Sequence, residues 1–259
     1  MKAVILAGGI GSRISEESLI RPKPMVEIGG KPILWHIMKI YSFYGINDFI
    51  ICCGYKGEMI KEFFVNYFTR NSDFTINIKN QDITVHRKTS EDWNVTLVDT
   101  GADSMTGGRL NRVKKFLKDE ENFCLTYGDG LANVNIKRLL EFHKRHKKKA
   151  TLTTVLPPGR FGMIKYDNKN KVVNSFVEKP SGDGSWINGG YFVLNKKVLG
   201  LVSKDSDIWE KKPLEKLARE KQLVAFEHKG FWKAMDTLKD KTVLEDMWKS
   251  NPLWKVWKN

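Results

Sequence analysis

The sequence predicts an α/β fold built on a mostly parallel twisted sheet with helices on both faces. Short apolar runs alternate with helical patterns along residues 1–156, and this alternation is typical of parallel sheets. Hydrophobic residues make up 41% of the 259 residues, which is enough for a sizeable core. A disordered chain and a disulfide-stapled mini-protein are therefore excluded.

The elements of this sheet follow one another in a regular order. Short apolar runs predict strands at Ala3–Ala7, Phe49–Cys53, Val95–Val98, Phe123–Tyr127 and Thr151–Val155. Apolar residues at helical spacing predict helices at Lys31–Tyr44, Ile60–Phe68, Leu110–Leu117 and Ile136–His146. We expect Pro32 in the first turn of its helix, where the missing N–H costs nothing.

The regular order is interrupted twice. Residues 69–93 alternate apolar and polar around Asn80-Gln81-Asp82, which predicts an inserted hairpin. After residue 157 the pattern predicts antiparallel elements at Gly162–Tyr166, Val172–Glu178, Trp186–Leu194 and Leu223–His228. No linker separates two halves, so we expect a single domain over residues 1–259.

Charge and cysteine content narrow the classes of function. The 44 Lys and Arg outnumber the 30 Asp and Glu, and a net charge of +14 attracts nucleic acids, membrane surfaces and phosphorylated small molecules alike. No apolar run is long enough for a membrane span, and the run at the N-terminus ends after Ala7, too soon for a signal peptide. Three cysteines, two of them adjacent, form no disulfide framework, which favours the cytoplasm.

A glycine-rich loop follows the first predicted strand, where ligands bind in open α/β sheets. The segment Leu6–Arg13 contains three glycines, whose backbone can approach a phosphate closely, and it ends in a cation. A second cation, Lys23, stands between two prolines. The loop lacks the Gly-Lys-Ser/Thr end of a Walker A motif and the third glycine of a dinucleotide fingerprint. We expect phosphate binding; the alternative is a tight turn with solvated charges.

Two aspartates are candidates for a metal site. Asp129 lies between glycines after the strand that ends at Tyr127, and Asp236 lies in an apolar context before a predicted helix. Mg²⁺ typically takes one or two protein carboxylates together with phosphate oxygens of the substrate. The alternatives are a turn aspartate for Asp129 and a helix cap for Asp236.

These segments, taken in order, resemble the sugar-1-phosphate nucleotidyltransferases. The resemblance spans nearly the whole chain and rests on LAGGIGSR, RPKPMVEI, GGKPI, YGDG, VEKP, INGGYF and GFWKAMDT. Within that family the chain looks most like the branch that makes CDP-glucose from CTP and α-D-glucose 1-phosphate. The segments associated with that branch are Ser15–Glu17, Thr96–Arg109 and Pro157–Gly162.

The resemblance implies roles for individual residues. Base and sugar of the nucleotide would be held by Leu6, Ala7, Gly8 and Gly9, and its triphosphate by Gly11, Ser12 and Arg13, with Lys23 and Gly128 beside them. The sugar phosphate would be held by Glu178, Lys179, Asn188 and Gly189, and Mg²⁺ by Asp129 and Asp236. The catalytic residues would be Arg13, Lys23 and Lys179. Thymidylyl relatives carry a Gln-rich segment where this chain has residues 103–109, so the base-reading candidates are Ser104, Gly108 and Arg109.

The resemblance also implies an organisation and a biological setting. It implies a Rossmann-like core over residues 1–156 that binds the nucleotide, with sugar-phosphate-binding and oligomerisation elements over residues 157–259. It further implies a homo-oligomer, with a hexamer as the suggested assembly, whose product feeds bacterial dideoxysugar and lipopolysaccharide synthesis. Trp248, Trp254 and Trp257 could form a docked tail or a subunit contact.

The implied reaction is attack by an oxygen of the sugar phosphate on the α-phosphorus of CTP, with release of pyrophosphate. A phosphate with a second pKa of about 6 is already an anion near neutral pH, so no general base is required. The alternative hypotheses for the function are uridylyl or thymidylyl transfer, a nucleotide-sensing domain and a nucleic-acid-binding module. Lys144–Lys149 lacks interleaved aromatics, which favours a solvated helix face; His36 and the cysteines are expected in the core.

Overall fold

A seven-stranded sheet forms the centre of the molecule, in the order β14-β10-β13-β8-β1-β4-β7. The computed structural model describes all residues except 12–13, 89, 158–162, 170, 178–184 and 259. The strands of the sheet are β1 (Lys2–Leu6), β4 (Asp48–Cys53), β7 (Asn94–Asp99), β8 (Asn122–Tyr127), β10 (Ala150–Val155), β13 (Ile187–Asn195) and β14 (Leu223–His228). All neighbours pair in parallel except β13, which is antiparallel to both β8 and β10.

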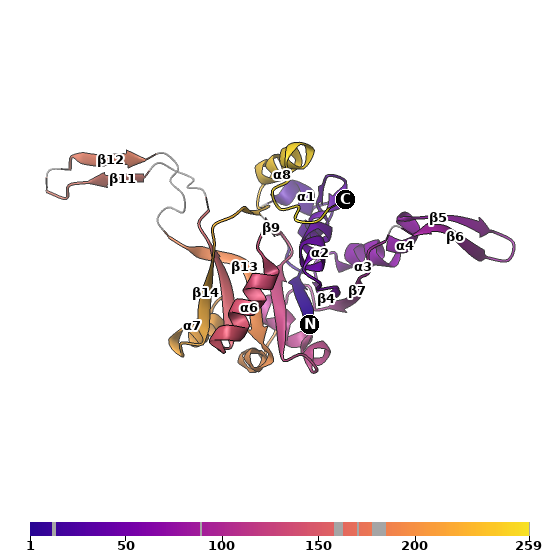
Figure 1. The fold of residues 1–259 in the computed structure, drawn as a ribbon, viewed down its shortest axis with the longest axis horizontal. Helices are drawn as coiled ribbons and strands as arrows, with labels where there is room; N and C mark the ends of the chain where they lie inside the picture. The colour runs from indigo at the N-terminus through magenta and orange to yellow at the C-terminus, as the bar shows by residue number, and fades with distance from the viewer. Residues whose placement is uncertain (12–13, 89, 158–162, 170, 178–184, 259) are drawn as a thin grey trace.

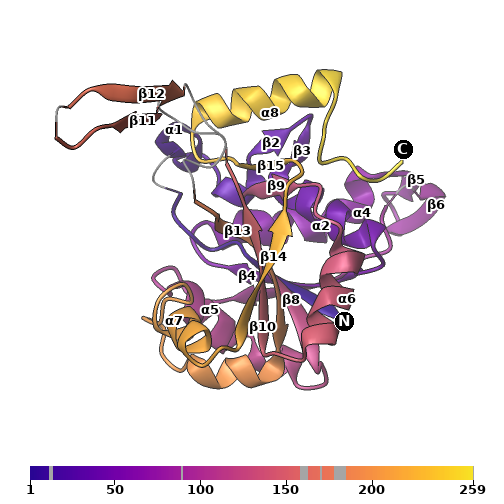
Figure 2. The ribbon, with the colours of Figure 1, turned by 60° about the vertical axis from the view of Figure 1, so that its left-hand side comes forward.

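Helices cover both faces of this sheet (Figures 1 and 2). The α-helices are α1 (Ser15–Ser18), α2 (Ile33–Phe43), α3 (Gly57–Val65), α4 (Tyr67–Arg70), α5 (Thr106–Arg112), α6 (Ile136–His146), α7 (Lys212–Arg219) and α8 (Leu238–Ser250). The 3-10 helices are η2 (Lys23–Met25), η3 (Lys114–Leu117) and η5 (Lys196–Leu201). None of these helices combines the length and the apolar character needed to cross a bilayer.

The two faces of β1 show why its sequence is apolar from Ala3 to Leu6. Alternate side chains of a strand point to opposite faces. Ala3 and Ile5 therefore pack into the core under α2, α3, α6, α8 and η2, whereas Val4 and Leu6 pack into the core under α5, α7, η3 and η5. The predicted α/β fold is confirmed.

Small differences from the expected elements have local causes. Pro32 does not lie in the first turn of α2; it is the N-cap, in extended conformation, because Lys31–Pro32 (β3) pairs with Glu27–Ile28 (β2). Gly29 and Gly30 have φ of 60° and 73°, as a two-residue hairpin turn requires. The predicted helix at Ile60–Phe68 breaks at Asn66, and the one at Leu110–Leu117 becomes α5 followed by η3.

The strand at Leu223–His228 was expected among antiparallel elements, and this expectation is wrong. β14 pairs in parallel with β10, beginning at Leu223 beside Ala150. Ala150 is also the register partner of Leu194, the residue before the last one of the antiparallel β13. β14 therefore starts at the same end of the strands at which β13 stops. For this reason it is parallel to β10. An alternating pattern carries no information about this direction.

Two hairpins project from opposite sides of the body (Figure 1). The first, β5 (Ser72–Asn77) with β6 (Asp82–Lys88), confirms the hairpin predicted within residues 69–93. The second pairs β11 (Met163–Tyr166) with β12 (Val173–Val177). Apolar side chains are exposed on both, among them Ile78 on the first and Phe176 on the second.

The C-terminal segment is docked on α2. Trp254 is fully buried, and its Nε1 donates to Nδ1 of His36 at 3.3 Å. Because an indole N–H only donates, His36 is neutral and its Nε2 donates to the carbonyl of Ile28 at 2.8 Å. His36 is a core side chain, as predicted. Of the two alternatives for Trp254, a docked tail or a subunit contact, the docked tail is correct.

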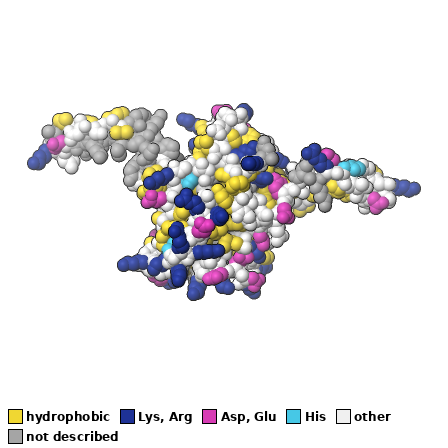
Figure 3. Space-filling view, viewed as in Figure 1, with side chains coloured by type: hydrophobic (Ala, Val, Ile, Leu, Met, Phe, Trp, Pro, Cys, Tyr) yellow, Lys and Arg dark blue, Asp and Glu magenta, His cyan; other side chains and the backbone are white. Residues whose placement is uncertain are grey.

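The basic run at the end of α6 is a solvated face. Lys144, Arg145, Lys147 and Lys148 are exposed. Figure 3 shows cationic side chains with a few acidic ones among them over this part of the body. On the inner side of α6, Thr151 Oγ1 lies 2.8 Å from His143 Nδ1 and 2.7 Å from His146 Nε2.

Stability should fall as the pH is lowered from 6.5 to 5.5, because burial lowers the pKa of His36 and of His143 from 6.5 to about 4. The unfolded chain then binds more protons than the folded one, which costs about 1 kcal/mol per histidine over that pH unit. Urea unfolding at several pH values measures this. A His143→Gln variant should show a shallower dependence, and an equal slope would contradict the assignment.

Candidate active site

The glycine-rich loop leaves β1 at the carboxyl edge of the parallel strands. The N–H of Ala7 donates to the carbonyl of Cys52 at 3.1 Å, and the N–H of Gly128 donates to that of Leu6 at 3.0 Å. Gly9 is exposed with open space around its Cα, whereas Gly11 has a φ of +70°, which favours glycine. The backbone is thus anchored on both sides of Leu6. Ser12 and Arg13 lie outside the described residues.

Three predicted residues meet beside this loop. Lys23 Nζ lies 2.6 Å from Oδ2 of Asp129 and 2.7 Å from Oδ1 of Asp236. The lysine opens η2 after Pro22, and its side chain is only 8% exposed. One ammonium group therefore bridges two carboxylates that are more than one hundred residues apart in sequence.

Backbone pairing brings the two aspartates together. Asp129 precedes β9 (Gly130–Ala132), and Asp236 follows β15 (Trp232–Ala234), which pairs with β9 in antiparallel fashion. The N–H of Met235 donates to the carbonyl of Asp129 at 2.9 Å. Figure 2 shows this small ribbon beneath α8. The separation of the carboxylates is thus set by a strand pair rather than by flexible loops.

Asp236 does not cap α8, so that alternative is wrong. Thr237 is the N-cap, and it forms a reciprocal capping box with Asp240. Asp240 Oδ2 also accepts the backbone N–H of Asp236 at 3.1 Å, and Oδ1 accepts from Lys233 Nζ at 2.7 Å. The capping box therefore leaves the Asp236 carboxylate to face Lys23.

The charges at this point suit a divalent cation. Burial pulls the pKa of Lys23 down, but Asp129 and Asp236 raise it more, so that it lies above the ordinary value and the lysine stays protonated. Two carboxylate oxygens converge on one cationic atom. Among the described residues, no group of three or more His, Cys, Asp or Glu side chains could hold a metal ion. The pair fits Mg²⁺, which uses one or two carboxylates with phosphate oxygens.

A pocket of about 50 Å³ opens next to Asp129. Its lining residues are Thr126, Tyr127, Asp129, Gly130, Asn188, Gly189, Gly190, Tyr191, Trp232 and Ala234. Trp232 Nε1 donates to the carbonyl of Gly189 at 2.8 Å, which joins β15 to the start of β13. The structure thus brings the predicted Asn188 and Gly189 beside the candidate metal site. Glu178 and Lys179 lie outside the described residues.

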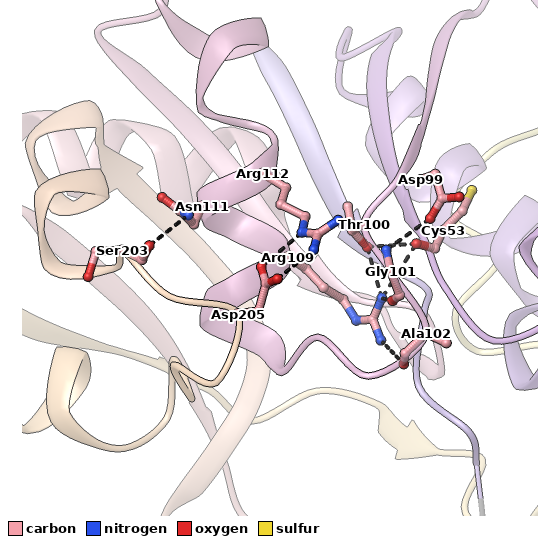
Figure 4. Close-up of polar contacts among 10 residues, drawn as sticks. All are labelled: Cys53, Asp99, Thr100, Gly101, Ala102, Arg109, Asn111, Arg112, Ser203 and Asp205. Atoms are coloured by element: carbon pink, nitrogen blue, oxygen red, sulfur yellow. Dashed lines mark hydrogen bonds and ion pairs between the residues drawn. The ribbon is translucent and has the colours of Figure 1, made fainter.

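Arg109 contacts the glycine loop and is 4% exposed. Figure 4 shows its guanidinium pointing toward Thr100, Gly101 and Ala102. Its Nη2 donates to the carbonyls of Gly8 at 2.8 Å and Ala102 at 3.1 Å. Its Nη1 contacts Thr100 Oγ1, the carbonyl of Gly101 and the carbonyl of Cys53 at 2.8, 2.7 and 3.4 Å. The guanidinium therefore joins the carboxyl end of β4 to the segments that follow β1 and β7.

Glycines make room for this guanidinium. A Cβ at Gly8 would stand 2.1 Å from Arg109 Nη1, and one at Gly54 would stand 2.3 Å from the same atom. Gly108 packs elsewhere: its Cβ would stand 2.3 Å from the carbonyl oxygen of Asp205. Ser104, two residues before α5 begins, is also buried. The predicted base-reading residues are therefore held mainly by protein atoms.

Two acidic residues of the site were not predicted. Glu210 accepts hydrogen bonds from Tyr127 and Thr106, and Asp240 holds the segment that carries Asp236. The spacing from Thr237 to Asp240 is that of a capping box and could have identified Asp240. Glu210 lies in a polar stretch with no pattern that marks it.

Known proteins resemble this chain over nearly its whole length. Residues 2–240 match the family described as nucleotidyl transferase. The chain is 60% identical to "Glucose-1-phosphate cytidylyltransferase" of Salmonella typhimurium over 258 residues, which cover 99% of this chain and 100% of the relative. It is 43% identical to "Probable glucose-1-phosphate cytidylyltransferase" of Bacillus subtilis, with coverage of 99% and 100%.

Solved structures support the fold. HddC from Yersinia pseudotuberculosis complexed with GMP-PN has a TM-score of 0.70 at 24% identity, covering 95% of this chain and 99% of that one. Apo-UDP-glucose pyrophosphorylase has a TM-score of 0.69 at 15% identity, with coverage of 97% and 99%. With the family match over most of its length, the chain belongs to the nucleotidyl transferase family.

Proposed function

We propose that this protein transfers CMP from CTP to α-D-glucose 1-phosphate, giving CDP-glucose and pyrophosphate. The observation that carries the proposal is the meeting of Lys23, Asp129 and Asp236 between the glycine loop and the pocket at Asn188. The reaction needs such a place, because two anionic substrates must approach each other. The choice of CTP and glucose 1-phosphate follows the 60% identical relative from Salmonella.

The roles proposed for individual residues follow the order of the substrates across the site. Nucleotide binding is assigned to Leu6, Ala7, Gly8, Gly9, Gly11, Ser12, Arg13, Lys23, Ser104, Gly108, Arg109 and Gly128. Sugar-phosphate binding is assigned to Glu178, Lys179, Asn188 and Gly189. Asp129 and Asp236 would hold Mg²⁺, which supplies positive charge to phosphate oxygens when bound.

The chain's own side chains would then position and neutralise the reactants. Lys23 brings a positive charge to the phosphates of the nucleotide, and Arg13 adds a second one. Lys179 aligns the attacking phosphate, which is already an anion, so no side chain needs to remove a proton. Positioning and electrostatics account for nearly all of the catalysis expected in such a transfer.

Pyrophosphate release from each of four nucleoside triphosphates, with glucose 1-phosphate and with or without Mg²⁺, tests the proposal. CTP with Mg²⁺ should give the fastest release. Faster release from UTP or dTTP would replace the cytidylyl proposal by a uridylyl or thymidylyl one. Tight RNA binding with a steep salt dependence and no release would favour a nucleic-acid-binding module instead.

Asp129→Asn should lower kcat at least tenfold, about 1.4 kcal/mol of transition-state stabilisation, because one of the two converging carboxylates is lost. Steady-state pyrophosphate release at saturating substrates measures this. Asp246→Asn, on the exposed side of α8, removes the same charge away from the site and should leave kcat unchanged. Near-normal turnover of Asp129→Asn would remove that residue from the metal site.

We also propose a cytoplasmic homo-oligomer that serves bacterial dideoxysugar and lipopolysaccharide synthesis, with six subunits as the number to test. Free, buried thiols at Cys52, Cys53 and Cys124 support a reducing compartment. Exposed apolar side chains on the two hairpins, including Ile78 and Phe176, support association between subunits. Since Trp254 is buried within its own chain, it does not supply that contact.

A further inference from the structure

Glu210 connects two parts of the candidate active site that are far apart in sequence. Its Oε2 accepts from Thr106 Oγ1 at 2.6 Å, and its Oε1 accepts from the hydroxyl of Tyr127 at 2.5 Å. Thr106 begins α5, which also carries Gly108 and Arg109, and Tyr127 ends β8, two residues before Asp129. One carboxylate therefore touches the proposed base-reading helix and the strand that leads to the metal site.

The hydrogen bonds that continue from Glu210 have a defined direction. A carboxylate offers only lone pairs, so the Tyr127 O–H must donate to it. The Tyr127 oxygen is then an acceptor, and Asn188 Nδ2 donates to it at 3.1 Å. Asn188 Oδ1 in turn accepts the backbone N–H of Gly190 at 2.8 Å. Both contacts of Asn188 select the same orientation of its amide. Within the described part of the chain the second N–H of Nδ2 has no further acceptor, so it can donate to a ligand.

Packing holds this chain of hydrogen bonds in place. Gly190 has a φ of +81°, and a Cβ there would stand 2.7 Å from the ring of Tyr127. On the other side, the N–H of Trp209 donates to Thr106 Oγ1 at 2.9 Å, and the N–H of Met105 donates to the carbonyl of Asp205 at 2.8 Å. Glu210 is therefore fastened to the first turn of α5, and Tyr127 is fixed against backbone.

The hydrogen bonds that start at Glu210 end in the pocket beside Asp129, since Tyr127, Asn188 and Gly190 all line this pocket. We propose that Glu210 is a positioning residue that acts through Tyr127 to hold the Asn188 amide with an N–H donor toward a hydroxyl of the bound hexose. This proposal rests on the proposed function, because it takes the pocket to be the site of the sugar phosphate. Glu210 itself touches neither substrate.

Glu210→Gln tests the proposal, because an amide places one donor where the carboxylate has only acceptors. When the N–H of the new amide faces Tyr127, the Tyr127 oxygen accepts that hydrogen bond and its own O–H proton turns elsewhere. The Tyr127 hydroxyl then no longer selects a single orientation of the Asn188 amide. The KM for glucose 1-phosphate should rise about tenfold, whereas the KM for CTP should change less than twofold. Glu215→Gln, an exposed change of the same kind on α7, is the matched control and should alter neither value.

A double-mutant cycle with Tyr127→Phe separates this role from a merely structural one. Glu210→Gln should add little to the KM for glucose 1-phosphate when Tyr127 is already Phe. Equal effects on both substrates, or additive effects in the cycle, would overturn the proposal. A wild-type chain that makes no CDP-glucose would contradict the proposed function instead.

If the wild type makes no CDP-glucose, urea unfolding of the four proteins of this cycle still tests the coupling between Glu210 and Tyr127. These proteins are the wild type, the two single variants and the double variant. Glu210→Gln should shift the unfolding midpoint less in the Tyr127→Phe background than in the wild type. Equal shifts in both backgrounds would show that the two side chains act independently, and they would overturn the proposal without reference to any substrate.

Discussion

Replacing Lys23 by alanine is expected to lower the free energy of unfolding by about 3 kcal/mol. The variant leaves two carboxylates side by side without the ammonium that bridges them at 2.6 and 2.7 Å, and unpaired charges in a buried pair are costly. The expected loss lies at the lower end of the range for buried pairs, because Asp129 and Asp236 remain 29% and 17% exposed. Urea unfolding at pH 7 in the presence of a chelator measures it.

Added Mg²⁺ should return part of this stability to Lys23→Ala, since a cation held by both carboxylates replaces the missing charge. The matched control is Lys229→Ala, which removes an exposed lysine paired with Glu227 and should change stability by less than about 0.5 kcal/mol. If Lys23→Ala is as stable as Lys229→Ala, the bridge contributes nothing to the fold. Turnover of Lys23→Ala should also fall at least tenfold.

Arg109→Ala should cost roughly 3 kcal/mol of stability and should also weaken the binding of CTP. The change removes charge-assisted hydrogen bonds to three chain segments and leaves buried carbonyl groups, such as that of Gly8, without a donor. Burial lowers the pKa of Arg109, but an arginine stays charged at neutral pH, so the lost contacts are ionic in character. Urea unfolding and calorimetric titration with CTP measure the two effects.

Arg112→Ala provides the comparison on the same helix. Arg112 forms an ion pair with Asp205 at 2.5 Å, and both side chains are more than two-fifths exposed (Figure 4). Ion pairs between solvent-exposed side chains contribute little to stability, so this variant should unfold at nearly the same urea concentration as the wild type. A loss for Arg109→Ala no larger than that for Arg112→Ala would mean that the guanidinium does not hold the strand ends together. Normal stability with weak CTP binding would indicate a direct contact with the nucleotide.

Much of the central sheet could be predicted from the sequence, for a physical reason. Strands buried on both faces, such as β1 and β4, are apolar at every position after their first residue, and this pattern is hard to mistake. Strand direction leaves no such pattern, which is why the parallel pairing of β14 was missed. The position of Pro32 was also missed, because the hairpin of Gly29 and Gly30 overrides the preference of proline for a first helical turn.

The candidate site was only partly predictable from the residues themselves. Asp129 and Asp236 were each open to a plain structural explanation, and only the resemblance joined them; the β9–β15 pairing that does so depends on tertiary contacts. Lys23 was predicted as a cation for phosphates, but its bridge between the carboxylates was not. Glu210 acts at a distance in sequence from both its partners, so no local pattern could reveal it.

The three buried cysteines of the sheet can serve as intrinsic probes of unfolding. Cys52, Cys53 and Cys124 lie in central strands, and burial raises the pKa of all three thiols, that of Cys53 to about 11 and that of Cys124 to about 12. Since the thiolate is the reactive form, an alkylating reagent has almost nothing to attack while the strands stay closed. The rate at which a thiol reagent labels the native protein therefore measures how often these strands separate, with no foreign probe introduced.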